Sequence, residues 1–169
     1  MQTKKKPNSI VEESLPTALG CWLIRHNNHQ LYRLTWLGWD KQSDSAPSHF
    51  ARHIQHIIDT YANTGYIDCS DISIHLQVTP FQLKVLEELS TIPCGQTKTY
   101  GEIAKRIHSS PRAVGQACRT NPIQLFIPCH RILSQKGIGG YMGKQSHTDF
   151  KLLLLNHEAK FHDSSDACD

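Results

Sequence analysis

The amino-acid sequence predicts two small lobes, the first built from a β-hairpin and a helix and the second mainly helical. Three observations predict this division. A chain of 169 residues is long enough for two modest cores. Strand-like segments lie before residue 40, and three short segments with helix-start signals follow residue 78. We therefore expect an N-terminal lobe over residues 1–77, a C-terminal lobe over residues 78–163 and a disordered tail over residues 164–169.

The first lobe begins with a segment of low apolar content. Residues 1–16 combine a lysine run with Pro, Asn and Ser, which predicts a mobile tail. Two strand-like segments, "CWLIR" and "LYRLTWL", then flank "HNNHQ", whose asparagines tolerate the positive φ angles of a tight turn. This pattern predicts a β-hairpin over residues 21–37.

An amphipathic helix is expected after the polar linker of residues 40–48. Its apolar positions recur at helical spacing and are Phe50, Ile54, Ile57, Ile58 and Tyr61. The "ANTG" sequence at 62–65 is a helix stop. The opposite face carries His49, His53 and His56, which could hold a metal. Zinc sites usually close a set of four ligands with cysteine or carboxylate, so we assign no metal to this stripe.

The second lobe opens with a capped helix over residues 80–89. Thr79 is its expected N-cap, Pro80 suits the first turn, and Gln82 would complete a capping box. The expected buried stripe is Phe81, Val85, Leu86 and Leu89. This segment predicts the first helix of the lobe.

Two further short helices follow in close succession. The segment 99–107 begins with a second capping box, Thr99 with Glu102, and Ser110 and Pro111 start the segment 111–119. Only "HSS" separates the two helices. A pair of short helices joined by a tight turn predicts a helix-turn-helix motif.

The last of these helices presents a cationic, nearly smooth face. At 100° per residue its face is formed by Arg112, Gly115, Gln116 and Arg119, with Ala113 beside it. Small residues let a helix backbone approach a sugar-phosphate wall, and arginines neutralise phosphates or enter a base stack. The alternative is a surface helix whose small residues pack against a neighbouring loop.

Charge and cysteine usage narrow the functional class. Residues 78–163 carry 11 Lys and Arg against 6 Asp and Glu, whereas residues 1–77 carry 7 of each, so the second lobe is the basic one. A basic lobe fits a polyanionic partner, although many solvated surfaces look similar.

The six cysteines form no C-x-x-C pair, which favours reduced thiols in a cytosolic protein. The longest apolar run, residues 152–155, is far too short for a membrane helix.

The segment "NPIQLFIPCHRI" places Cys129 beside His130 after a buried run. An adjacent imidazole can favour the thiolate directly or through one water. The thiolate is the nucleophilic form of cysteine. A third group would orient the imidazole, and the last helix offers His157 and Glu158. The alternative is that Cys129 is a buried small apolar residue, the usual fate of a free cysteine and the one we assign to the other five.

These motifs together resemble the O6-alkylguanine-DNA alkyltransferases. The resemblance rests on "TYGEIA" at 99–104, "RAVGQACRTNP" at 112–122, "PCHRI" at 128–132, "GGYMG" at 139–143 and "LLNHE" at 154–158, in family order over about 80 residues. It implies a ribonuclease H-like α/β N-terminal lobe and a winged helix-turn-helix-like motif in the C-terminal lobe. Residues 1–77 match only loosely.

The resemblance also implies a role for each site residue. Cys129 corresponds to the alkyl acceptor, His130 to the base acting through water, and Glu158 to the group that orients His130. Asn121 corresponds to the residue tying the helix-turn-helix to the active loop, and Tyr141 to the phenol that binds the guanine oxygen. The implied DNA-binding residues are Tyr100, Arg112, Ala113, Gly115, Gln116 and Arg119. The implied substrate pocket comprises Cys118, Pro128, Tyr141, Met142 and Gly143.

The implied activity is a single-turnover DNA repair reaction. The protein would bind duplex DNA through its minor groove and flip out O6-alkylguanine, or O4-alkylthymine, into the pocket. It would need no cofactor, act as a monomer, and reside in the cytoplasm, or the nucleus of a eukaryote. Gln116, Cys118, Gln124 and Met142 depart from common family residues, which leaves the tolerated adduct size open.

Three other functions can be weighed against transfer. A papain-type hydrolase also uses Cys and His but would turn over and needs an oxyanion hole. A pure damage-binding relative carries tryptophan where this chain has Cys129. A transcriptional regulator could use the helix-turn-helix, but 169 residues leave no space for a regulatory domain.

Overall fold

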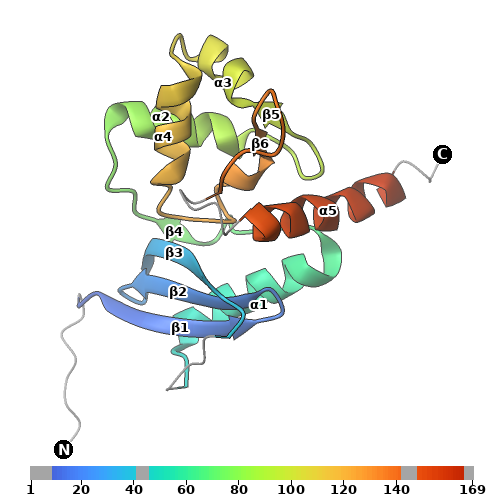
Figure 1. Ribbon diagram of the computed structural model, residues 1–169. Coiled ribbons are helices and arrows are strands. Elements are labelled where there is room, and N and C mark those ends of the chain that lie inside the picture. Colours follow the sequence, from blue (N-terminus) through green and yellow to red (C-terminus); the bar gives the residue numbers. More distant parts are fainter. Residues whose placement is uncertain (1–8, 41–45, 142–147, 166–169) are drawn as a thin grey trace, which may run out of the picture. The chain divides into compact units, whose positions relative to one another are not determined.

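The computed structural model describes residues 9–40, 46–141 and 148–165, with side chains up to Phe161 (Figure 1). The chain forms two compact units, residues 1–63 with 67–77 and residues 64–66 with 78–169. Within the described ranges, no helix is both long enough and apolar enough to cross a membrane.

The first unit is a small sheet with one helix. Strands β1 (Val11–Thr17), β2 (Gly20–His26) and β3 (Gln30–Gly38) are antiparallel neighbours, and the short β4 (Ser73–Ile74) pairs in parallel with β3. Helix α1 (His49–Thr64) connects β3 to β4. The predicted hairpin is confirmed as β2–β3, and Asn28 at its turn adopts a φ of 70°.

Strand β1 corrects the prediction of a mobile tail over residues 1–16. From Val11 onward the chain pairs residue by residue with β2, and Leu15 is fully buried. The polar side chains and Pro16 that suggested a tail are tolerated because β1 is the edge strand of the sheet. Residues 1–8 lie outside the described residues.

Helix α1 buries the predicted apolar stripe. Ile54, Ile58 and Tyr61 are fully buried, whereas Phe50 is only partly covered. On the polar face, His53 Nε2 lies 2.8 Å from Asp71 Oδ2. Among the described residues, no group of three or more His, Cys, Asp or Glu side chains could hold a metal ion.

The second unit contains α2 (Pro80–Ser90), β5 (Lys98–Thr99), α3 (Tyr100–Arg106), α4 (Pro111–Arg119), β6 (Ile132–Leu133) and α5 (Thr148–Ser165). Strands β5 and β6 pair in parallel. The predicted N-caps are confirmed: Thr99 forms a complete capping box with Glu102, and Ser110 accepts a hydrogen bond from the Ala113 amide. Local capping thus fixes where α3 and α4 begin.

Helix α2 corrects two details. Thr79 caps it by accepting from the Gln82 amide, but the Gln82 side chain does not complete a capping box. Instead, Gln82 Nε2 donates to the carbonyl and hydroxyl oxygens of Thr120, each at 3.0 Å, and so ties α2 to the end of α4. Phe81, expected in the core, is 39% exposed. The Gln82 side chain therefore hydrogen-bonds Thr120, a residue distant in the chain, rather than the N-terminus of its own helix.

Helix α5 extends further than expected. It continues through Ser165, two residues into the segment predicted as a disordered tail, while residues 166–169 lie outside the described residues.

Candidate active site

The segment after α4 carries Cys129 into the interior of the second unit. Ile123 and Leu125 are buried, and Leu125 adopts a positive φ of 72° that reverses the chain. Pro128 then precedes a 3-10 turn over Cys129–Arg131. Cys129 is only 4% exposed, and its amide donates to the Ile127 carbonyl at 2.8 Å. The local backbone therefore fixes the direction of the thiol.

Asn121 connects the end of α4 to this thiol. Its side-chain Nδ2 donates to the Ile127 carbonyl at 2.9 Å and to Cys129 Sγ at 3.3 Å, and its Oδ1 accepts from the Ile123 amide at 3.0 Å. The side chain is buried. Both polar atoms of one amide group thus hold the segment that carries Cys129 against the end of α4.

His130 and Glu158 form a buried pair. His130 Nε2 lies 2.7 Å from Glu158 Oε1, and both residues are fully buried. The sequence offered two residues of the last helix as the group that orients His130. Glu158 is the one that contacts His130, whereas His157 makes an edge contact with Phe161. Helix α5 thereby supplies the group that orients the imidazole.

The charges of this pair settle the tautomer of His130. Burial alone would raise the pKa of Glu158, but hydrogen bonds from His130 and Arg131 and the positive charge of Arg131 hold that pKa well below its ordinary value. An ionised carboxylate only accepts, so Nε2 of the neutral imidazole carries the proton. Burial also lowers the pKa of His130, so the ring is neutral at pH 7. Its Nδ1 then holds a lone pair and is buried without a hydrogen-bond partner among the described residues.

Arg131 completes the anchoring of Glu158 and was not foreseen from the sequence. Its Nε donates to Glu158 Oε2 at 2.9 Å, a second guanidinium nitrogen reaches Oε1 at 2.8 Å, and a third donates to the Ile92 carbonyl at 2.7 Å. The Gly95 amide donates to Oε2 at 3.1 Å. The carboxylate is therefore held by four N–H groups of three residues, His130, Arg131 and Gly95, from two segments of the chain, which leaves it little freedom to rotate.

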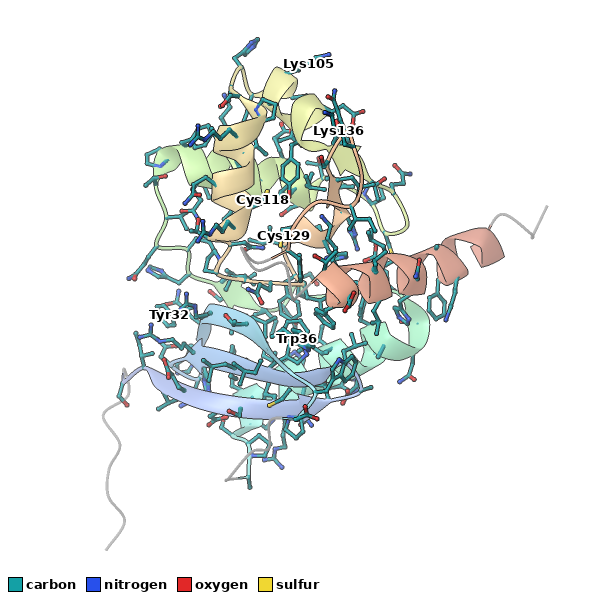
Figure 2. All side chains as sticks on the ribbon, in the orientation of Figure 1. Tyr32, Trp36, Lys105, Cys118, Cys129 and Lys136 are labelled. Atoms are coloured by element: carbon teal, nitrogen blue, oxygen red, sulfur yellow. The ribbon has the colours of Figure 1, made fainter. Side chains whose placement is uncertain are left out.

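Cys129 lies on the wall of a cavity of about 150 Å³. Figure 2 labels Cys129 and Cys118, two of the residues that line it. The cavity is lined by Tyr100, Gly115, Cys118, Arg119, Cys129, Gly140 and Tyr141. Six of these seven residues were singled out from the sequence, and they come from α3, α4 and the loops that follow α4 and β6. Pro128 is buried directly before the thiol but does not line the cavity. Met142 and Gly143 lie outside the described residues.

The cavity holds its thiols in the protonated form. Burial raises the pKa of Cys129, and the Asn121 hydrogen bond, the Lys151 cation and the Tyr141 phenol lower it only in part. Burial likewise raises the pKa of Cys118 to about 12 and that of Tyr100 to about 12. Reaction at Cys129 therefore requires a base that removes its proton as the new bond forms.

The remaining predicted residues lie on the outer face of α4. Arg112 and Gln116 are exposed, Ala113 is partly covered, and Val114 and Cys118 face the core, as the helical spacing predicted. A Cβ added to Gly115 would meet the Tyr100 ring at 3.8 Å, an ordinary contact distance. Gly115 and Arg119 belong both to this cationic face and to the lining of the cavity.

Lys151 is a second residue that the sequence reasoning missed. It is fully buried on α5, although it sits in a leucine-rich segment that gave no functional signal. Its spacing from Glu158 was the available signal. The two residues are seven positions apart, or two helical turns, and therefore lie on the same face of α5 as buried Leu154.

Comparison with known proteins identifies the family of this chain. Residues 80–160 match the family described as "6-O-methylguanine DNA methyltransferase, DNA binding domain". The chain is 48% identical over 93 residues to the methylated-DNA--protein-cysteine methyltransferase of Archaeoglobus fulgidus. That alignment covers 53% of this chain and 63% of the relative, so the chain spans less than two thirds of that curated relative.

Solved structures extend the similarity over both units. The Mycobacterium tuberculosis OGT in complex with DNA is 29% identical, with a TM-score of 0.71 over 88% of this chain and 92% of that one. An O6-methylguanine DNA methyltransferase from Methanococcus jannaschii is 32% identical, with a TM-score of 0.64 over 89% of this chain and 93% of that one. Because this identity extends over nearly the whole length of both proteins, the chain belongs to the O6-methylguanine DNA methyltransferase family.

Proposed function

We propose that this protein repairs O6-alkylguanine in DNA by transferring the alkyl group to its own Cys129, once per molecule. The observation that carries the proposal is the position of Cys129, which lines a cavity, accepts a hydrogen bond from Asn121 and is followed in the chain by the buried His130–Glu158 pair.

The proton of Cys129 would leave through His130. The tautomer set by Glu158 leaves the lone pair on Nδ1, and a buried polar atom of this kind is usually satisfied by ordered water. One water between the thiol and Nδ1 would relay the proton, and the Glu158 carboxylate would stabilise the imidazolium that forms.

The transfer itself is a single displacement. The sulfur forms a bond to the alkyl carbon while the bond between that carbon and guanine O6 breaks, and the bonding electrons pass to O6. Tyr141, on the cavity wall, would donate a hydrogen bond to O6 as negative charge develops there, and the departing guanine anion would take up a proton from water. The product is a thioether, which has no carbonyl for water to attack, so the thiol is not regenerated.

The α3–α4 pair would bind the duplex. We propose that it acts as a winged helix-turn-helix that enters the minor groove, with Arg112 replacing an extruded nucleotide and Tyr100 turning the phosphate at the target. Ala113, Gly115, Gln116 and Arg119 would line the contact. The exposed arginine on α4, the glycine beside Tyr100 and the solved DNA complex of a relative support this.

Further parts of the proposal rest on the family relationship. The first unit would be a ribonuclease H-like supporting lobe, and O4-alkylthymine would be a second substrate. The protein would act as a monomer in the cytoplasm, or in the nucleus of a eukaryote, without a cofactor.

Intact-protein mass spectrometry after incubation with excess methylated duplex tests the proposal. We expect each molecule to gain one methyl group and then stop, with no gain in Cys129→Ala and an unchanged gain in Cys69→Ser, a thiol of the first unit. Continued demethylation beyond one equivalent would contradict single turnover. Tight binding without any mass change would instead indicate a damage-binding protein.

A further inference from the structure

The cavity contains a second thiol, to which the proposed reaction assigns no task. Cys118 and Cys129 both line the cavity of about 150 Å³ and are 6% and 4% exposed. The other cysteines of the described ranges, Cys21, Cys69 and Cys94, lie outside its lining. The cavity therefore presents two sulfur atoms to whatever enters it.

Asn121 connects the two thiol-bearing residues. Its backbone amide donates to the Cys118 carbonyl at 3.2 Å, and its side-chain Nδ2 donates to Cys129 Sγ at 3.3 Å. Cys118 lies in the last turn of α4 beside buried Ala117, on the side of the helix that faces the core. The two sulfurs are thus held on the wall of one small cavity by a single intervening residue.

Alkylation of the first thiol changes the reactivity of the second. Burial raises the pKa of Cys118, and the negative charge of an ionised Cys129 raises it further, because a like charge disfavours ionisation. Transfer turns Cys129 into a neutral thioether and removes this repulsion. The nearby Lys151 cation, which lowers the pKa of Cys118, remains. Cys118 is therefore the weaker nucleophile before transfer and ionises more readily after it.

We propose that Cys118 is a second acceptor, which captures the remaining electrophilic carbon of a bifunctional alkyl group after its transfer to Cys129. The substrate class is O6-alkylguanine whose alkyl group carries a leaving group on its second carbon, with 2-chloroethyl as the simplest case. This activity rests on the proposed function. A methyl thioether is inert, whereas a 2-chloroethyl thioether still alkylates nucleophiles, which the bound duplex offers. A second thiol in the cavity would consume that reactivity.

The capture is a sequence of two displacements after transfer. The Cys129 thioether sulfur first displaces chloride from the second carbon, which closes a three-membered sulfonium ring and releases chloride with the bonding electrons. The Cys118 sulfur then forms a bond to one ring carbon. The bond from that carbon to the sulfonium sulfur breaks, its electrons return to the Cys129 sulfur, and the proton of Cys118 passes to water. The product is a two-carbon bridge between two thioethers, and HCl is lost.

Peptide mapping after reaction with a duplex that bears O6-(2-chloroethyl)guanine tests the proposal. We expect Cys118 and Cys129 in one linked peptide pair that has gained two carbons and two hydrogens and contains no chlorine. A thiol held in the same cavity has a high effective concentration, so this product should exceed the 2-hydroxyethyl thioether formed by water by about 10-fold or more. Predominance of the 2-hydroxyethyl thioether, or of a cross-link between Cys129 and DNA, would overturn the proposal.

Two cysteine variants provide the comparison. Cys118→Ser removes the second thiol with little change in volume, and Cys94→Ser removes a partly exposed thiol of the same unit that lies outside the cavity lining. Among molecules alkylated at Cys129, the bridge should vanish in Cys118→Ser and persist in Cys94→Ser. Scoring only alkylated molecules removes any effect of the variants on the transfer rate. A Cys129 bridge to another side chain in Cys118→Ser, at the wild-type yield, would contradict the role of Cys118.

Two further substrates separate this proposal from the proposed function. A protein that accepts methyl from methylated duplex but takes no chloroethyl group would overturn the second acceptor and leave the proposed function intact. Applied without DNA, 1,2-dibromoethane offers the same two electrophilic carbons and should give the same bridge. Loss of methyl transfer with a dibromoethane bridge present would refute the proposed function and retain the thiol pair. No bridge from either reagent would overturn the pair itself.

Discussion

Glu158 Oε1 lies 2.7 Å from His130 Nε2 in a fully buried pair, 28 residues apart in the chain. This contact determines which nitrogen of the imidazole is free to act as a base. The carboxylate holds the proton on Nε2 and leaves the lone pair on Nδ1, the atom that takes up the proton of Cys129 in the proposed mechanism.

Replacing Glu158 by Gln tests the importance of that charge. Glu158→Gln preserves the shape but removes the anion that stabilises an imidazolium, so the single-turnover transfer rate should fall about 100-fold or more. Glu87→Gln, an exposed acid on α2, is the control. A Glu158→Gln rate within twofold of wild type would show that the pair is only structural.

The same carboxylate should make stability depend on pH. Its pKa is depressed in the folded protein relative to 4.5, so its stabilising contribution is present above about pH 4.5 and is lost as pH falls toward the folded value. Urea unfolding at pH 7 and pH 3 should show a larger loss for wild type than for Glu158→Gln. Parallel losses would mean that other carboxylates dominate acid unfolding.

Asn121→Ala should affect both the thiol and the fold. Without the amide, the pKa of Cys129 should rise, so the pH profile of its reaction with iodoacetamide should move upward. The Ile127 carbonyl and the Ile123 amide would lose their partner, at a cost of about 1–3 kcal/mol in the free energy of unfolding. An unchanged pH profile in a folded variant would exclude a role for Asn121 in thiol ionisation.

Arg112→Ala should separate duplex DNA from small substrates. Arg112 is exposed on α4 and is absent from the cavity wall. Repair of methylated duplex should therefore fall far more than alkylation by free O6-benzylguanine, with Arg52→Ala of α1 as an exposed-arginine control. Equal losses on both substrates would contradict the proposed insertion into the base stack.

Gly115→Ala should stabilise the folded protein and lower its affinity for duplex DNA. An added Cβ would meet Tyr100 at an ordinary 3.8 Å, and alanine favours a helix over glycine by about 1 kcal/mol. The new methyl group would, however, keep the α4 backbone away from a sugar-phosphate wall. Thermal unfolding and fluorescence anisotropy with duplex DNA check the two effects, and unchanged affinity would place α4 outside the groove.

Local signals in the sequence predicted much of the second unit. The cap residues Thr99 and Ser110 fixed the starts of α3 and α4, because an N-cap depends only on residues within one turn. The same local reasoning failed for Gln82, whose side chain has a partner 38 residues away. Strand β1 was missed because an edge strand tolerates polar residues and proline, so its composition matches that of a tail.

The site required information that no local pattern contains. Cys129 and His130 were predicted from their adjacency, whereas the partner of His130 was assigned only through the family resemblance, since α5 offered two candidates. Arg131 and Lys151 were missed because their importance lies in partners from other segments, namely Glu158 and the carbonyls of the loop after β6. Charged residues of this kind look like ordinary surface positions until their burial is known.

Peptide mapping after reaction with duplex DNA bearing an isotopically labelled methyl group on guanine O6 tests the central claim most directly. The account predicts one label per protein, on the sulfur of Cys129, with unmodified guanine left in the DNA. A label on Cys118 or on any other side chain, or release of the label into solution while the protein stays unmodified, would contradict it.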